Sequence, residues 1–110
     1  MTTAQAGAVP TDARLEADIE EVKRIVLRGL GTHRARVWLF GSRARRAGGR
    51  ASDIDLAILP LEPLPAGTLT RIEESLENSL VLYPVDLVDL SSAEPALRER
   101  VERDGIPWKN

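Results

Sequence analysis

Apolar residues near the start of the chain recur at helical spacing. Four of them follow one another at intervals of four, three and four, which puts them on one helix face: Leu15, Ile19, Val22 and Val26. Thr11 or Asp12 can cap the start of this helix, and Gly29 and Gly31 can stop it. The pattern predicts an amphipathic helix over residues 12–28.

Three other patterns predict strands. Residues 37–40 form a short, continuous apolar run bounded by polar residues, which is typical of a buried strand. Residues 53–59 and 85–90 alternate instead, so successive side chains lie on opposite faces. In the first alternating segment Asp53 and Asp55 share a face, and in the second Asp86 shares a face with Val88.

Helical patterns separate these strands. Residues 66–80 predict a helix whose buried stripe is Leu69, Ile72, Leu76 and Leu80. Ser91 or Ser92 can cap a last helix that runs to Asp104 and ends at Gly105, before a short tail. A short helix can also begin at Ser42 and run to residue 46. The order predicts an α/β fold in which helices flank a small mixed β-sheet.

Length and composition limit the possibilities further. A chain of 110 residues fits one domain, and we expect a flexible N-terminal segment over residues 1–11 and a single domain over residues 12–110. No apolar run approaches the length that crosses a bilayer, and the N-terminus lacks the pattern of a secretory signal. Cysteine is absent, so a cytoplasmic location is the default expectation.

The net charge of -2 hides a local asymmetry. The segment from Arg34 to Arg50 carries six arginines and no acidic residue, and Asp53 and Asp55 follow it directly. A basic segment that leads into paired carboxylates suits a polyphosphate and a metal ion better than a uniform nucleic-acid surface. The alternative is a solvated, arginine-rich loop.

The paired carboxylates are the first candidate site. Asp53 and Asp55 leave the same face of one strand, with Cα atoms roughly 6.5–7 Å apart. Two such carboxylates repel each other unless a cation lies between them, and hard oxygen ligands of this kind suit Mg²⁺. An Asp-x-Asp pair alone is weak evidence, because such pairs also occur at exposed strand edges.

The turn after the first strand is the second candidate. Gly41 allows a ligand to approach the backbone, and free N–H groups at the start of the following helix can bind an anion. The Ser42 hydroxyl can donate to a phosphate oxygen, and the guanidinium groups of Arg43 and Arg45 suit phosphate geometry. The alternative is a plain turn capped by serine and followed by surface arginines.

Asp86 is a third candidate, because a carboxylate on an otherwise apolar strand requires an explanation. A neighbouring strand could bring it beside the Asp53/Asp55 pair. It could then bind a metal ion or accept a proton from an attacking hydroxyl. It could also be an ordinary edge residue, and we interpret Asp89, on the other face, as a solvated strand end.

These motifs together resemble the signature of the DNA polymerase β nucleotidyltransferase superfamily. Gly41-Ser42 is followed by ten residues and then by Asp53-Ile54-Asp55. Residues 39–45 and 52–56 look like the minimal nucleotidyltransferase (MNT) branch of that superfamily. The resemblance runs from about residue 12 to residue 106, and it implies a polymerase-β-like nucleotidyltransferase fold.

The resemblance also implies roles for individual residues. Gly41 and Ser42 would hold the triphosphate of ATP, and Arg43 and Arg45 would contact phosphates. The carboxylates Asp53, Asp55 and Asp86 would form the catalytic, metal-binding triad for two Mg²⁺ ions, for which Mn²⁺ could substitute. Arg46 departs from the family pattern, which has glycine there, so the path of this loop and the arginine that meets the nucleotide stay open.

Many MNT proteins pair with a HEPN-domain ribonuclease toxin, and the resemblance implies an antitoxin that adenylylates a toxin tyrosine. Inhibition of the toxin by contact alone is the main alternative. Transfer to a small molecule would need a further domain to hold the acceptor. Direct binding of nucleic acid would need aromatic platforms, and aromatic residues make up only 4% of the chain.

Overall fold

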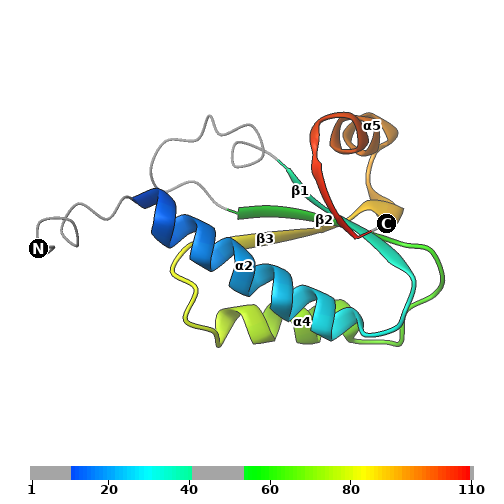
Figure 1. Ribbon diagram of the computed structural model, residues 1–110. Helices are drawn as coiled ribbons and strands as arrows, with labels where there is room; N and C mark the ends of the chain where they lie inside the picture. The colour runs from blue at the N-terminus through cyan, green and yellow to red at the C-terminus, as the bar shows by residue number, and fades with distance from the viewer. Residues whose placement is uncertain (1–10, 41–53, 110) are drawn as a thin grey trace, which may run out of the picture.

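The computed structural model of the chain describes residues 11–40 and 54–109. Helices and strands are interspersed along it (Figure 1). In chain order they are α2 (Thr11–Leu30), β1 (Ala35–Phe40), β2 (Ile54–Pro60), α4 (Thr68–Glu77), β3 (Val85–Asp89), the 3-10 turn η1 (Leu90–Ser92), α5 (Pro95–Asp104) and β4 (Ile106–Lys109).

Four strands form one sheet in the order β3-β2-β1-β4. β1 pairs antiparallel with β2 and with β4, whereas β2 and β3 are parallel, with α4 in the connection between them. The sheet is therefore mixed, and the predicted α/β fold with helices around a small mixed sheet is confirmed.

Helices cover the two faces of the sheet unequally. α2 and α4 lie side by side against one face (Figure 1), where Ile54, Leu56 and Ile58 pack with residues of both helices. The opposite face carries a smaller apolar cluster, in which Trp38 and Ala57 meet residues of η1 and α5. Successive side chains of β2 thus pack into two core layers on opposite faces of the sheet.

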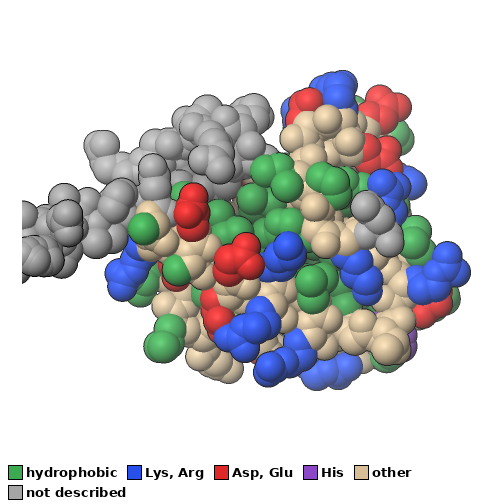
Figure 2. All heavy atoms as spheres, viewed as in Figure 1, with side chains coloured by type: hydrophobic (Ala, Val, Ile, Leu, Met, Phe, Trp, Pro, Cys, Tyr) green, Lys and Arg blue, Asp and Glu red, His purple; other side chains and the backbone are tan. Residues whose placement is uncertain are grey.

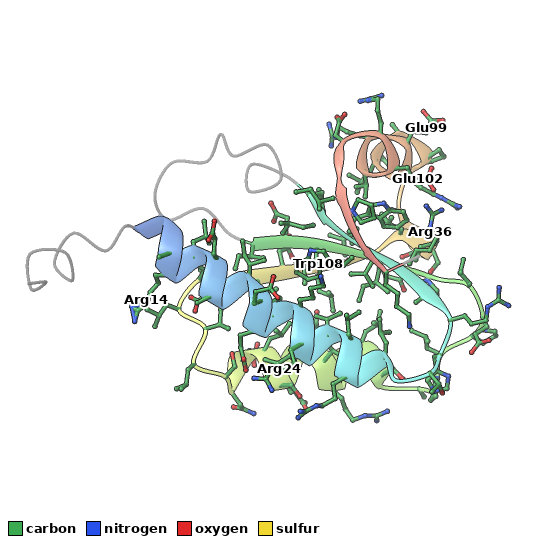
Figure 3. All side chains as sticks on the ribbon, in the orientation of Figure 1. Arg14, Arg24, Arg36, Glu99, Glu102 and Trp108 are labelled. Atoms are coloured by element: carbon green, nitrogen blue, oxygen red, sulfur yellow. The ribbon has the colours of Figure 1, made fainter. Side chains whose placement is uncertain are left out.

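An ion pair joins α5 to β1, beside a cation–ring contact within β1. The Arg36 guanidinium lies 4.7 Å from the centre of the Trp38 ring, and its Nη1 is 3.9 Å from Oε2 of Glu102 on α5 (Figure 3). The Trp38 side chain is buried beneath this contact. The second face is therefore covered by α5 at the end where Arg36 lies.

The first helix is longer than the sequence pattern predicts. α2 continues through Gly29 to Leu30, and Gly31, with φ 60°, ends it. A Cβ at Gly29 would lie 2.4 Å from Cγ1 of Ile72 on α4. Gly29 therefore serves the close approach of the two helices rather than the end of α2.

The second helix is shorter than expected. α4 begins at Thr68, whose hydroxyl donates to the Pro65 carbonyl at 2.7 Å, and it ends at Glu77. Ile72 and Leu76 are buried as predicted, but the prediction for Leu80 is wrong, because that side chain is 93% exposed. Leu80 follows the C-cap Asn78, so helical spacing no longer governs its position.

The C-terminal part differs in two ways. The last helix starts at Pro95 rather than after Ser91 or Ser92, because Asp89 accepts hydrogen bonds from the Ser91 N–H and hydroxyl and holds a separate 3-10 turn. Asp89 is thus a half-buried cap and not merely a solvated strand end.

The predicted tail is a strand, β4. A Cβ at Gly105 would lie 2.7 Å from the Val101 carbonyl oxygen and 3.2 Å from Cβ of Trp38. Glycine therefore allows the chain to leave α5 directly against β1 and to pair with it. Within residues 11–40 and 54–109, no helix combines the length and apolar character needed to cross a membrane. The short helix predicted over residues 42–46 lies outside the described residues.

Candidate active site

Strand register places two of the predicted carboxylates side by side. Asp55 on β2 is the direct partner of Asp86 on the parallel strand β3. Paired residues of adjacent strands lie on the same face, and neighbouring strands are about 4.8 Å apart. Phe40, the last residue of β1, is the partner of Asp55 on its other side. These three residues form one row across the sheet.

A backbone hydrogen bond at the start of β2 and β3 fixes the register of this row. The Ile54 N–H donates to the Pro84 carbonyl at 2.8 Å, and Ile54 is the register partner of Val85. Ile54 is fully buried against the α2/α4 layer. Because neighbours along a strand alternate, Asp55 must leave the opposite face, and the parallel register puts Asp86 on that face too.

The next row along the same face is apolar. It contains Trp38, Ala57 and Val88, all of which belong to the smaller core cluster. Exposure rises from this row toward the carboxylates, because Ala57 is fully buried, Asp55 is half-buried and Asp86 is exposed. The carboxylates therefore lie at an accessible end of the second face, next to a row of apolar residues.

The other predicted site residues lie outside the described residues: Gly41, Ser42, Arg43, Arg45 and Asp53. Gly41 directly follows Phe40 in the chain, and Asp53 directly precedes Ile54. Both are thus covalent neighbours of residues at the carboxylate end of the sheet. Among the described residues, no group of three or more His, Cys, Asp or Glu side chains is placed to hold a metal ion.

The donor chemistry of the Asp55/Asp86 pair fits a divalent cation. Like charges directly opposite each other on adjacent strands destabilise a sheet, and a cation between them removes that cost. Carboxylate oxygens are hard ligands of the kind that Mg²⁺ prefers, and Mg²⁺ commonly uses one or two of them together with phosphate oxygens. Two carboxylates in register therefore suffice for a site that a nucleotide would complete.

Sequence patterns did not identify two features at this end of the molecule. Phe40 was expected in a strand but not beside a carboxylate, because register is not visible in a single strand's pattern. The exposed Leu82, near the start of β3, was also missed, since no periodic pattern covers residues 81–84.

Comparisons with known proteins identify the family of the chain. The family described as "Polymerase beta, Nucleotidyltransferase" matches residues 32–107. A curated protein of Haemophilus influenzae, named "Probable protein adenylyltransferase MntA", is 36% identical over 67 residues. That match covers 61% of this chain, and the chain spans only 59% of the length of that relative.

Two solved structures share the fold. One is of a minimal nucleotidyltransferase, with 33% identity and a TM-score of 0.65, and the match covers 81% of this chain and 91% of the other. The second is a toxin–antitoxin structure with AMP-PNP, with 28% identity and a TM-score of 0.60, covering 84% of this chain and 71% of the other. The family match spans more than half of the chain, which therefore belongs to the polymerase beta nucleotidyltransferase family.

Proposed function

We propose that this chain transfers AMP from ATP to a hydroxyl group of a partner protein, in a reaction that needs Mg²⁺. The observation that carries the proposal is the register of Asp55 and Asp86, two carboxylates side by side on one face of the sheet. In a chain of this family, such a pair is suited to bind a metal–nucleotide complex. The adenylyltransferase name of the curated relative and the AMP-PNP in a similar toxin–antitoxin structure support the choice of nucleotide.

Each candidate residue has a place in this proposal. Asp53, Asp55 and Asp86 would hold the metal, as two Mg²⁺ ions or as Mn²⁺ in their place. The metal, when bound, would offset the negative charge of the triphosphate and of the departing pyrophosphate. Gly41 and Ser42 would bind phosphate oxygens through a backbone N–H and a hydroxyl.

The remaining roles concern charge and proton transfer. Arg43 and Arg45 would add cationic contacts to the phosphates. Asp86 is exposed, and it comes from a different strand than Asp55, so it can face an incoming acceptor. Its carboxylate would accept the proton of the attacking hydroxyl, or would serve as a further metal ligand.

The proposed reaction forms one phosphorus–oxygen bond and breaks another. The acceptor oxygen forms a bond to the α-phosphorus of ATP while the bond from that phosphorus to the bridging oxygen of the β-phosphate breaks. Pyrophosphate leaves with the electron pair of the broken bond. The hydroxyl proton passes to a carboxylate, and the products are the AMP ester and pyrophosphate.

The acceptor that the family resemblance implies is a tyrosine of a HEPN-domain toxin, which would make this chain an antitoxin. A toxin–antitoxin pair among the similar solved structures supports the antitoxin part of this proposal. Contact inhibition without catalysis is the second candidate, and the exposed Leu80 and Leu82, which a partner protein could cover, favour it.

Metal-dependent ATP binding tests the site. We expect calorimetry to show ATP binding with Mg²⁺ or Mn²⁺ and to show its loss in EDTA or in the variant Asp53→Ala/Asp55→Ala. Glu20→Ala, which removes an exposed carboxylate on α2, is the control and should bind ATP normally. Equal ATP affinity in EDTA and in Mg²⁺ would rule out the metal-binding role of the carboxylates.

A further inference from the structure

The segment between α4 and β3 presents apolar side chains to solvent. Leu80 is 93% exposed and Leu82 is 66% exposed, and they are the two most exposed large hydrophobic residues among those that the structure describes. Figure 2 shows hydrophobic side chains at the surface where α4 runs into β3. Exposure of these side chains is unfavourable, because removal of apolar surface from water is a main source of folding and binding free energy.

The backbone of this segment is held in place. The Ser79 hydroxyl donates to the Leu76 carbonyl at 2.6 Å and accepts from the Val81 N–H at 3.2 Å. The Leu82 N–H donates to Oδ2 of Asp18 on α2 at 3.1 Å. Val81 and Tyr83 pack inward against the α2/α4 layer, so the alternating Leu80 and Leu82 are directed outward. The exposed leucines belong to a preformed surface.

Two glutamates lie close to these leucines in the chain, at a helix end where negative charge is unfavourable. α4 ends with Glu74 and Glu77, both exposed, and its last turn has no basic residue. Carboxylates at a helix C-terminus are repelled by the helix dipole. Neither glutamate forms an ion pair with another described residue. Arg14, near the start of α2, adds one positive charge at this end of the molecule (Figure 3).

The surface also leads directly to the carboxylate row. Leu82 lies four residues before Asp86, and Pro84 between them accepts the hydrogen bond that aligns β3 with β2. A partner protein large enough to reach around the start of β3 can therefore contact Leu82 and Asp86 together. We propose that Leu80 and Leu82, with Glu74 and Glu77 beside them, form the docking surface for the acceptor protein. This inference rests on the proposed function.

The occupant follows from the chemistry of the surface. Two outward leucines fit an apolar groove on the partner, and the glutamates at the end of α4 fit lysine or arginine side chains at the rim of that groove. Burial of the leucines would supply most of the affinity, and the charge pairs would speed association. The docking surface and the carboxylates would then contact one partner at the same time.

The test uses the full chain and, as partner, a purified HEPN-domain toxin of the kind that the proposed function names. Leu80→Ser/Leu82→Ser should raise the KM for the partner and the Kd of the complex by about tenfold or more. The ATP affinity and the rate at saturating partner should not change. Leu61→Ser is the matched control, because Leu61 is also exposed, at 45%, but follows the opposite end of β2. An unchanged KM and Kd in the double leucine variant would overturn the inference.

A charge variant separates docking from a structural role. Glu74→Gln/Glu77→Gln should slow association with the partner and weaken its dependence on salt, while the melting temperature stays the same or rises because the helix dipole is relieved. A lower melting temperature with an unchanged association rate would contradict the inference. Absence of AMP transfer by the wild-type chain, with a complex that still depends on Leu80 and Leu82, would instead reject the enzymatic proposal and leave the docking surface standing.

Discussion

The two described carboxylates of the candidate site differ in exposure although they share one register position. Asp55 is half-buried between Phe40 and Asp86, whereas Asp86 lies exposed on the edge strand β3. Alternation along each strand predicts which residues of that strand share a face with Asp55 or with Asp86. Their pairing depends on the parallel register of β2 and β3, which no single-strand pattern contains.

Substitution of Asp86 should impair transfer more than nucleotide binding. Asp86→Asn keeps the size of the side chain but removes its charge, so it cannot accept the acceptor proton. We expect transfer of label from α-labelled ATP to fall about a hundredfold or more, the usual contribution of a general base. ATP affinity, measured by calorimetry, should change much less, because Asp53 and Asp55 remain.

Asp89→Asn is the matched control for that measurement. Asp89 lies on the same strand but on the other face, and its Oδ1 accepts hydrogen bonds that an asparagine oxygen can also accept. Its transfer rate should stay close to that of the wild type. If Asp86→Asn weakens ATP binding as strongly as it slows transfer, Asp86 is a metal ligand and not the proton acceptor.

The hydroxyl of Ser42 is expected to contact a phosphate. Ser42→Ala should weaken ATP binding by roughly 1–2 kcal/mol, the worth of a hydrogen bond to a charged group. Thermal stability should stay the same in the absence of ATP. A variant with a lower melting temperature and unchanged ATP affinity would show that Ser42 only caps a helix.

Among the helices and strands, the sequence predicts those whose residues follow a local pattern. Three strands and three helices were identified, with shifted ends, from apolar spacing, alternation and capping residues. The strand β4 was taken as a tail, because its residues have no alternation of their own and pair only after Gly105 lets the chain close on β1. The end of α4 was placed three residues too far, because Leu80 continued the helical spacing after the helix had ended.

Gly29 is the element-scale feature that a substitution can test. In a helix interior, alanine is normally more favourable than glycine by about 1 kcal/mol. Here the added Cβ would lie 2.4 Å from Cγ1 of Ile72, and overpacking of a core costs about 1–3 kcal/mol. We therefore expect Gly29→Ala to lower the free energy of unfolding, measured as the midpoint of urea denaturation.

A second substitution identifies the cause of that loss. Ile72→Ala removes the Cγ1 atom that the new methyl group would meet. The double variant Gly29→Ala/Ile72→Ala should then be more stable than the sum of the two single effects predicts, as expected for residues in direct contact. Simple additivity would show that the space between α2 and α4 is not what requires glycine at this position.

For the whole molecule, the open question is whether catalysis or contact accounts for the proposed antitoxin role. The carboxylate row and the leucine surface lie close together at one end of the fold, so one partner could meet both. Their functions can nevertheless be separated, because the carboxylates are not part of the apolar core and their removal should leave the docking surface intact.

The triple variant Asp53→Ala/Asp55→Ala/Asp86→Ala makes that separation. We expect it to bind the proposed HEPN-domain partner in a pull-down with purified proteins and to fail to rescue growth of cells that express that protein as a toxin. Leu80→Ser/Leu82→Ser should fail in both assays when the chain is expressed at a low level, and overexpression should restore rescue because the catalytic groups are intact. Full rescue by the triple variant would mean that contact alone neutralises the toxin, and the enzymatic account of the biological role would then be wrong.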